Sequence, residues 1–211
     1  MSNIIKSLSL ILLIILTGTA SVSYGGAPTE INAKLKTSNY QVYIREGTLG
    51  DHYQLSYSPS TPWGLIEGVG VRHTQLSLFR SGAEENRFII DSVNLLKHTS
   101  PIGDFGVSSR LEYRSFSSAS PSIKNTNEWR IRAILSYDTP TFTYKKLSVQ
   151  GWATVSPRFS TKSNSDSRNQ AGFNITHTDY PLIISPFVDT IRDEHLHHKY
   201  SLVGVYVTLP L

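Results

Sequence analysis

The chain has 211 residues, enough for one domain with its own core. Its formal net charge is +4, from 20 Lys and Arg against 16 Asp and Glu, and the basic residues are spread along the chain rather than gathered into the stripe typical of nucleic-acid-binding proteins. The absence of cysteine excludes disulfides, thiolate catalysis and cysteine-bound metals.

The first 25 residues have the pattern of a secretory signal peptide. Lys6 precedes an apolar run from Leu8 to Leu16, and small residues follow it. An uncleaved anchor helix is the weaker alternative, because a run of about nine residues is shorter than the roughly 20 that a membrane-spanning helix needs. We expect cleavage after Ala20 or Gly25. The exported domain then covers residues 26–211 and, without Lys6, carries a net charge of 19 − 16 = +3.

Residues 31–45 are expected as one long bent strand or two short strands. The parity of the apolar residues changes near Ser38–Asn39, which suggests a bulge. The rest of the chain reads mostly as strand and turn, without a long apolar run or a convincing helical stripe. Further strands are expected at 53–57, 64–79, 88–97, 105–116, 128–138, 147–155, 171–175, 182–190 and 200–211.

The most regular pattern lies between Phe105 and Asp138. Apolar residues recur there with a period of two along both expected strands: Phe105, Val107, Leu111 and Tyr113, then Trp129, Ile131, Ala133, Leu135 and Tyr137. Each strand therefore has one apolar and one polar face. If the two pair as a hairpin, the polar face collects Arg110, Glu112, Arg114, Arg130 and Arg132. Such a face could lie on a soluble sheet or line the wet interior of a membrane barrel.

The connections between these strands alternate in length. Residues 98–104, 138–141 and 179–181 are short connections, and residues 117–127, 156–168 and 191–199 are long ones. Bacterial outer-membrane barrels have short periplasmic turns, longer extracellular loops and an even number of strands, whereas a soluble β-sandwich needs no such alternation. We therefore expect an all-β, antiparallel up-and-down transmembrane β-barrel with both termini in the periplasm.

The number of strands depends on two segments. The barrel has about 10 strands if residues 31–45 form a single bent strand, and 12 if segment 64–79 or its neighbours hide another hairpin. An exported soluble β-protein is the alternative to the membrane barrel.

The last segment and several aromatic residues also favour a membrane barrel. Residues 203, 205, 207, 209 and 211 are all Val or Leu, similar to the final strand of outer-membrane barrels, although those tend to end in an aromatic residue and this chain ends in Pro210–Leu211. Tyr137, Tyr180 and Tyr200 lie near expected strand ends, where interfacial girdles occur. In a soluble protein they would be half-buried core edges.

The arginine-bearing face is the candidate functional site. Inward-facing Arg110, Arg114, Arg130 and Arg132 would give a narrow passage a positive potential and bind carboxylates in a bidentate way. The alternative is that they pair with Glu112, Asp138 and neighbouring residues, and only fill a narrow barrel.

Three stretches resemble strands of small Gram-negative outer-membrane barrels, namely the oligogalacturonate-specific porin group and similar barrels. They are Arg-Leu-Glu-Tyr-Arg at 110–114, Trp-Arg-Ile-Arg-Ala-Ile-Leu-Ser-Tyr at 129–137 and Arg-Asn-Gln-Ala-Gly-Phe at 168–173. The resemblance covers about the second half of the chain. It implies that the four arginines bind and conduct acidic oligosaccharides. The mature chain is shorter than those porins, which argues against an open twelve-stranded pore.

Enzymatic function has weaker support. There is no Gly-x-Ser-x-Gly motif. His177 with Ser148 or Ser185 could form an acyl-transfer pair, and residues 193–198 contain carboxylates and imidazoles, but a rim histidine and a solvated loop are the simpler interpretations. We expect no catalytic residue, cofactor or metal.

The expected function is that of a porin-like channel or binding protein for small anionic solutes such as acidic oligosaccharides. We expect a monomer in the outer membrane of a Gram-negative bacterium, with outer-membrane lipid and the barrel-assembly machinery as partners and no nucleic acid. The alternatives are a barrel enzyme that acts on lipid by acyl transfer, and a soluble exported β-protein with a polar ligand-binding face.

Overall fold

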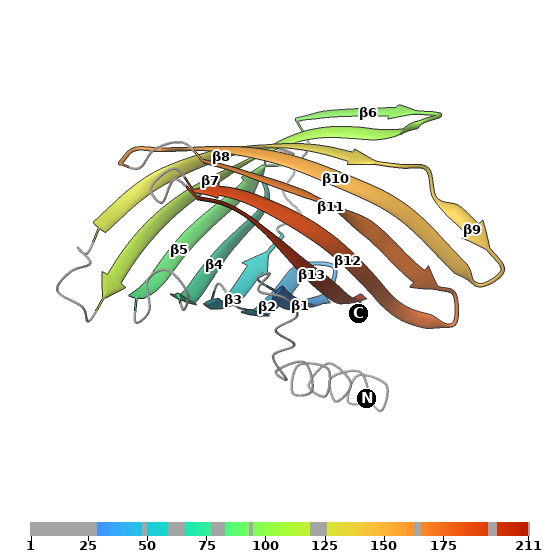
Figure 1. Ribbon diagram of the computed structural model, residues 1–211, viewed down its shortest axis with the longest axis horizontal. Helices are drawn as coiled ribbons and strands as arrows, with labels where there is room; N and C mark the ends of the chain where they lie inside the picture. The colour runs from blue at the N-terminus through green and yellow to red at the C-terminus, as the bar shows by residue number, and fades with distance from the viewer. Residues whose placement is uncertain are drawn as a thin grey trace.

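Thirteen strands make up the described part of the chain (Figure 1). The computed structural model describes residues 29–47, 50–58, 66–76, 83–92, 95–118, 126–162, 166–193 and 198–210, so the expected signal peptide lies outside the described residues. No helix among these residues is long and apolar enough to cross a membrane. The strands are β1 (Thr29–Lys36), β2 (Tyr40–Gly47), β3 (Gly50–Tyr57), β4 (Ile66–Leu76), β5 (Ala83–Ser92), β6 (Leu96–Ser100), β7 (Gly103–Ser118), β8 (Thr126–Asp138), β9 (Phe142–Tyr144), β10 (Leu147–Ser160), β11 (Asp166–His177), β12 (Tyr180–Asp193) and β13 (His198–Pro210).

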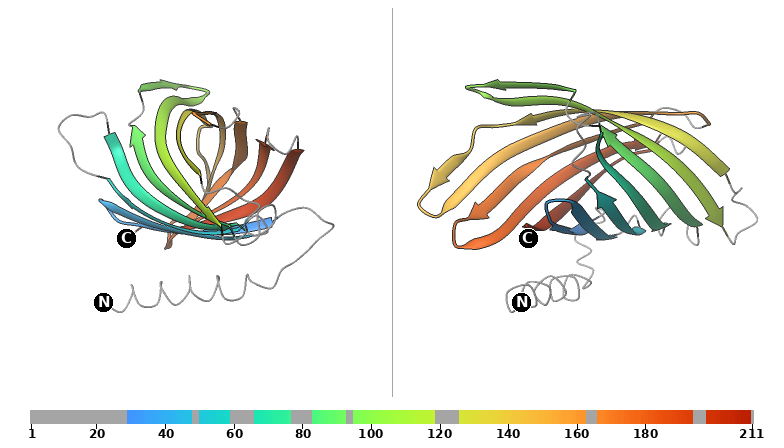
Figure 2. Two further views of the ribbon diagram at one scale, coloured as in Figure 1. Left: turned by 90° about the vertical axis from the view of Figure 1, so that its left-hand side faces the viewer. Right: turned by 180° about the vertical axis from the view of Figure 1, so that it is seen from behind.

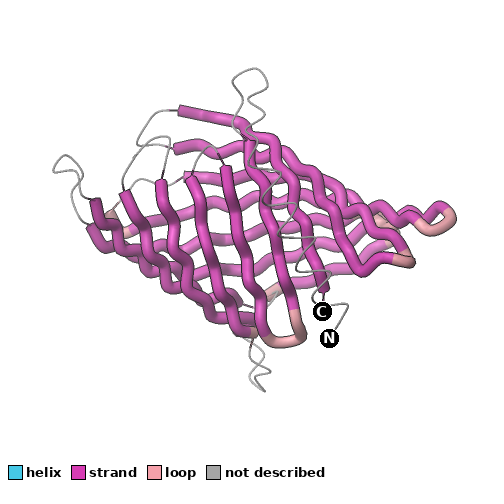
Figure 3. The backbone as a smooth tube through the Cα atoms, turned by 90° about the horizontal axis from the view of Figure 1, so that it is seen from below, coloured by secondary structure: helices cyan, strands magenta, loops and turns pink. Residues whose placement is uncertain are grey.

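Among the described residues, eleven strands close into one barrel, whose wall wraps round in Figures 2 and 3. Around the wall they follow the order β1, β2, β3, β4, β5, β7, β8, β10, β11, β12 and β13, and β13 then pairs with β1. That last pair is parallel, with Ala33 opposite Val207, and the other pairs around the wall are antiparallel. An odd number of up-and-down strands requires this, because the first and the last strand then run in the same direction. The start of β1 and the end of β13 therefore lie at opposite ends of the barrel, so the expectation that both termini lie on the same, periplasmic side is wrong.

The structure therefore confirms an all-β barrel but not the expected strand count of 10 or 12. Segment 31–45 is not a single bent strand. It turns back on itself at Thr37, whose backbone N donates to the carbonyl of Tyr40 at 2.8 Å, so the change of parity at Ser38–Asn39 marks a hairpin turn rather than a bulge. Segment 64–79 contains one described strand, β4. Splitting the first segment adds one strand to the expected ten.

Two short strands lengthen hairpins beyond the barrel wall (Figure 1). β6 pairs with the start of β7, and β9 pairs with the start of β10. The expected turn at 138–141 is consequently misplaced, because the chain stays extended past Thr139 and turns at Lys145, where φ is +53°. At the β6–β7 turn Gly103 has φ +140°, and an added Cβ would lie 2.3 Å from the carbonyl oxygen of Asp138.

The barrel wall separates an apolar exterior from a largely polar interior. Because side chains alternate along each strand, one set points outward and the other inward. The outward set includes many exposed apolar side chains: Val42, Leu55, Val71, Phe88, Leu111, Trp129, Ile131, Leu135, Val155, Phe159, Phe173, Val188 and Val203. The inward set is rich in buried charged side chains: Glu30, Arg45, Glu85, Glu112, Arg114, Glu128, Arg130, Arg132, Arg158 and Asp189.

The buried apolar cluster inside the barrel lies on the side of β12 and β13, although Ile89 on β5 and Phe116 on β7 are also buried. Phe187 and Leu202 are buried in this cluster, with Trp152 and Tyr206 packed against them. The rings of Phe187 and Tyr206 stack with centroids 4.5 Å apart. The remainder of the described interior belongs mainly to charged and polar residues, which make up the candidate site.

Candidate functional site

All five residues predicted from the hairpin face point into the barrel. They lie on β7 and β8, where Arg110 is opposite Arg132 and Glu112 is opposite Arg130. Glu112, Arg114, Arg130 and Arg132 are buried, and Arg110 is half-buried. The period of two along this hairpin therefore placed these side chains on a common face, and closure of the sheet turned that face inward.

Glu112 is the centre of the network. Its carboxylate lies 3.2 Å from Nη1 of Arg87, 3.5 Å from Nη2 of Arg132, and 4.0 Å from a terminal nitrogen of both Arg110 and Arg130. These four cations come from three neighbouring strands, β5, β7 and β8. One fully buried carboxylate thus balances part of the charge of four guanidinium groups, and their attraction offsets part of the desolvation cost of burying it.

A second group of ion pairs, around Glu85 and Glu128, lies two residues further along β5, β7 and β8. Glu85 accepts two hydrogen bonds from Arg87, at 2.6 and 2.8 Å, and a further one from Arg114. Glu128 accepts from Arg114 at 2.6 Å and from the hydroxyl of Ser160 at 2.6 Å. Arg114 therefore bridges two carboxylates on opposite sides of β7, which it shares with Arg87 and Arg130.

Arginines also line up across three neighbouring strands. Arg110, Arg132 and Arg158 are consecutive partners in the register of β7, β8 and β10. Arg110 donates to Asp91 through Nε at 2.5 Å and Nη2 at 3.0 Å. Arg132 has only its longer contact with Glu112, and its Nε has no hydrogen-bond partner within the described part of the chain. The row thus combines one neutralised arginine with a guanidinium that retains a free donor.

The network continues on the other side of the barrel, where the sequence pattern predicted no candidate residue. Arg168 pairs with Asp189 and lies 3.7 Å from Glu30, which also lies 3.3 Å from Arg45. Among the side chains that the structure describes, the linked or adjacent groups are nine arginines (45, 72, 87, 110, 114, 130, 132, 158 and 168) and six carboxylates (30, 85, 91, 112, 128 and 189). Arginines outnumber carboxylates by 9 − 6 = 3 among these described groups, and the register sets a further acidic residue, Asp166, opposite Arg158.

The missed arginines lie where the sequence pattern was weakest. Arg87 was assigned to a polar stretch before a strand, and Arg158 and Arg168 to a long polar loop, although both belong to strands. The alternation of these arginines with apolar residues such as Phe88 and Phe159 was the pattern that could have predicted strands there. Strand ends rich in Ser, Thr and Asn obscured it, because these residues are typical of turns.

Asp138, which the alternative interpretation counted among the partners of the arginines, is not part of the network. It lies six residues from Arg132 on β8, about 20 Å along an extended strand. Its neighbour across the sheet is Asp104, another carboxylate. The arginines of the hairpin pair instead with Asp91, Glu85, Glu128 and Glu112.

The proposed acyl-transfer pairs do not form. Ser148 is inward-facing, whereas His177 is directly opposite Leu147 and so lies on the outer face. Ser185 donates to Asn174 at 2.8 Å, and His177 accepts from the backbone N of Asp179 in the β11–β12 turn at 3.1 Å. Residues 194–197 of the expected histidine-rich loop lie outside the described residues. The described residues contain no group of three side chains suited to hold a metal.

These features define the class of fold as a closed β-barrel with a charged interior and an apolar exterior. Comparisons with protein-family models, with curated proteins and with solved structures found no match. The function must therefore be argued from the geometry of the barrel itself.

Proposed function

We propose that this protein is a barrel embedded in the outer membrane of a Gram-negative bacterium, where it forms a channel or binding site for small anionic solutes. One observation carries the membrane location: large apolar side chains are exposed outside while arginine–carboxylate pairs are buried inside. A water-soluble barrel has the opposite polarity, because its outer face meets water. In a membrane, the apolar outer face would contact hydrocarbon, and the charged inner face would contact water or ions.

The lengths of the wall strands in the second half of the chain support this location, whereas β1, β2 and β3 have eight residues each. The wall strands β7, β8, β10, β11, β12 and β13 have 12 to 16 residues. A tilted strand needs about 9–11 residues to cross a bilayer. Aromatic side chains occur near strand ends, as expected at the membrane–water interface. Tyr180 is exposed beside the β11–β12 turn, and Tyr137 packs on Phe105 near the start of β7.

The row of Arg110, Arg132 and Arg158 supports the preference for anions. Three guanidinium groups from adjacent strands face one interior, and Arg132 retains a free Nε donor. Carboxylates and phosphates match the donor geometry of guanidinium groups. Acidic oligosaccharides are one class of solute with this chemistry.

Conductance in planar bilayers tests the proposal. We expect the wild-type protein to give discrete, anion-selective steps, and Arg132→Gln to lower the anion-to-cation permeability ratio about tenfold. A tenfold change corresponds to roughly 1.4 kcal/mol, well within the roughly 4 kcal/mol between unit charges 4 Å apart near a protein surface.

The matched control is Lys146→Gln, which removes a cation at the exposed tip of the β9–β10 turn, where Lys146 pairs with Asp179. It should leave the permeability ratio unchanged. A heat-dependent shift in gel mobility checks that each variant is folded. Cation selectivity in the wild type, or an equal ratio in wild type and Arg132→Gln, would contradict a role for the arginines, and silence from a folded barrel would exclude a channel.

A further inference from the structure

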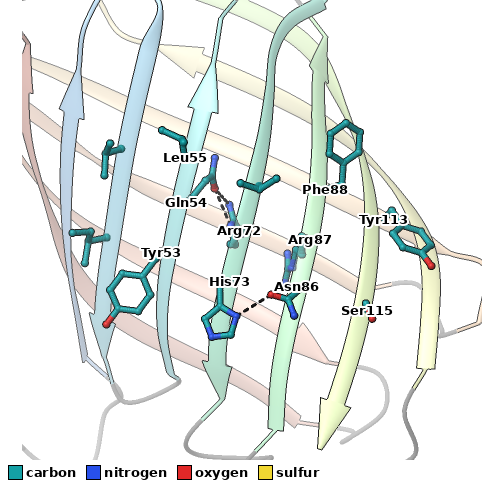
Figure 4. A pocket seen from close by; sticks show the side chains of 13 residues that line it. Tyr53, Gln54, Leu55, Arg72, His73, Asn86, Arg87, Phe88, Tyr113 and Ser115 are labelled. Carbon is teal, nitrogen blue, oxygen red and sulfur yellow. Dashed lines mark hydrogen bonds between the residues drawn. The ribbon is translucent and has the colours of Figure 1, made fainter.

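A groove of about 630 Å³ runs over the outer face of the barrel across β2, β3, β4, β5 and β7 (Figure 4). Its floor is formed by the apolar side chains of Leu55, Val71 and Phe88, which are neighbours in the register of three strands and are all exposed. Tyr113 extends this row onto β7. The groove thus offers a continuous apolar surface where hydrocarbon would lie against the wall.

A polar row borders the apolar floor. Tyr53, His73, Asn86 and Ser115 follow one another in the register of β3, β4, β5 and β7, and all four line the groove. His73 Nδ1 donates to Oδ1 of Asn86, at 2.9 Å, which fixes the orientation of the ring (Figure 4). The hydroxyls of Tyr53 and Ser115 and the amide nitrogen of Asn86, whose orientation the contact with His73 holds, supply donors at this level, and donors are what a phosphate group binds.

The next outward-facing row, closer to the barrel end, is acidic. Asp51 is opposite Gln75, and Gln75 is opposite Glu84. These residues lie two positions beyond Tyr53, His73 and Asn86 on their strands, next to where β3 begins, β4 ends and β5 begins. The outer face therefore changes from apolar to hydrogen-bonding to acidic over three successive rows.

We propose that this groove binds a zwitterionic phospholipid. An acyl chain would lie along Leu55, Val71 and Phe88, the phosphate would meet the row of His73 and Asn86, and the ammonium group of the headgroup would meet Asp51 and Glu84. The order of these chemical groups in the lipid matches the order of the three rows, and the acidic row disfavours an anionic headgroup. This inference rests on the proposed membrane location and adds a specific lipid class.

The same geometry does not indicate lipid hydrolysis at this site. Ser115 is the hydroxyl on the β7 side of Asn86, and it lies two strands from His73, about 10 Å at the usual strand spacing. A hydroxyl at that distance cannot transfer its proton to the histidine. We therefore assign His73 and Asn86 to headgroup binding.

Native mass spectrometry of the full chain in detergent, with equal amounts of phosphatidylethanolamine and phosphatidylglycerol added, tests the proposal. We expect one retained phosphatidylethanolamine per barrel in the wild type. His73→Leu combined with Asn86→Leu should reduce this retention at least tenfold. Glu84→Lys should reverse the preference, so that phosphatidylglycerol is retained instead.

Two matched controls separate the groove from the rest of the surface. Asn169→Leu removes an exposed outward amide on β11, on another part of the wall, and Glu67→Lys reverses an exposed charge at the other end of β4. Both should retain phosphatidylethanolamine as the wild type does. Equal retention of the two lipids by the wild type, or the same losses in the control variants, would overturn the proposal.

Flotation of the wild-type protein with phospholipid vesicles distinguishes failure of this inference from failure of the proposed function. A protein that stays soluble without detergent and does not float is not a membrane barrel, and both proposals then fail. A protein that floats but shows no lipid preference contradicts the lipid site alone.

Discussion

Glu112 shows how a single residue allows several arginines to share one interior. It is fully buried and faces Arg87, Arg110, Arg130 and Arg132 at 3.2 to 4.0 Å. Without its negative charge, these four guanidinium groups would repel one another at close range. The carboxylate therefore allows the four arginines to lie together in the fold.

At the residue scale we expect Glu112→Gln to destabilise the barrel by about 3–5 kcal/mol, the usual cost of removing one partner from a buried ion pair. Urea unfolding of the refolded protein in lipid vesicles measures this loss. The control is Glu67→Gln, the same chemical change at an exposed site on β4, which should stay within about 0.5 kcal/mol of wild type. Equal stability of both variants would mean that the network contributes nothing to folding.

Close packing around Phe187 distinguishes the side of the interior formed by β11, β12 and β13. On β13 Gly204 faces Phe187 of β12, and an added Cβ would lie 2.5 Å from Cζ of that ring and 2.8 Å from Cγ of Glu30 on β1. Gly172 on β11 has the same role, since its Cβ would lie 2.9 Å from Cβ of Phe187. Glycine is required at these places so that aromatic rings fit inside a narrow barrel.

At the element scale we expect Gly204→Ala to lower stability by about 1–3 kcal/mol, as overpacking usually does. Phe187→Leu removes the ring atoms that the new methyl group meets. The double variant should therefore lose less than the sum of the two single losses, a coupling that unfolding of all four proteins measures. Strict additivity would show that the ring and the glycine do not pack against each other.

The parallel pairing of β1 with β13 decides the shape of the whole molecule. It closes the wall with an odd number of strands and sets Ala33 opposite Val207. The seam joins segments more than 160 residues apart in sequence. An even barrel of ten or twelve strands would have no such parallel pair.

At the scale of the whole molecule, cysteine crosslinking tests this seam, because the chain has no native cysteine. Ala33→Cys with Val207→Cys should form a disulfide on mild oxidation, since neighbouring strands lie about 5 Å apart and disulfides join Cα atoms roughly 4.4–6.8 Å apart. The resulting loop should alter gel mobility under denaturing conditions. Ala33→Cys with Val203→Cys is the matched control, because Val203 is opposite Thr29 and about 13 Å further along the strand. Crosslinking of the control pair, or of neither pair, would contradict the register.

Much of the fold follows from the sequence, because a period of two is a local property. It predicted the strands around Phe105–Asp138 and the common face of Arg110, Glu112, Arg114, Arg130 and Arg132 before any pairing was known. It left two alternatives open at residues 31–45, one bent strand or two short strands, because the same change of parity is compatible with a bulge or with a turn. Only the hydrogen bonds to the neighbouring strands distinguish those two cases.

The sequence by itself thus determined that the chain is all-β and which residues share a face. The tertiary structure alone decided that eleven strands close through a parallel seam, which face points inward, and that Glu112 meets Arg87 from a strand 25 residues earlier. The physical reason is that alternation depends on adjacent residues along one strand. Closure and ion pairing depend on the register between strands that are distant in sequence.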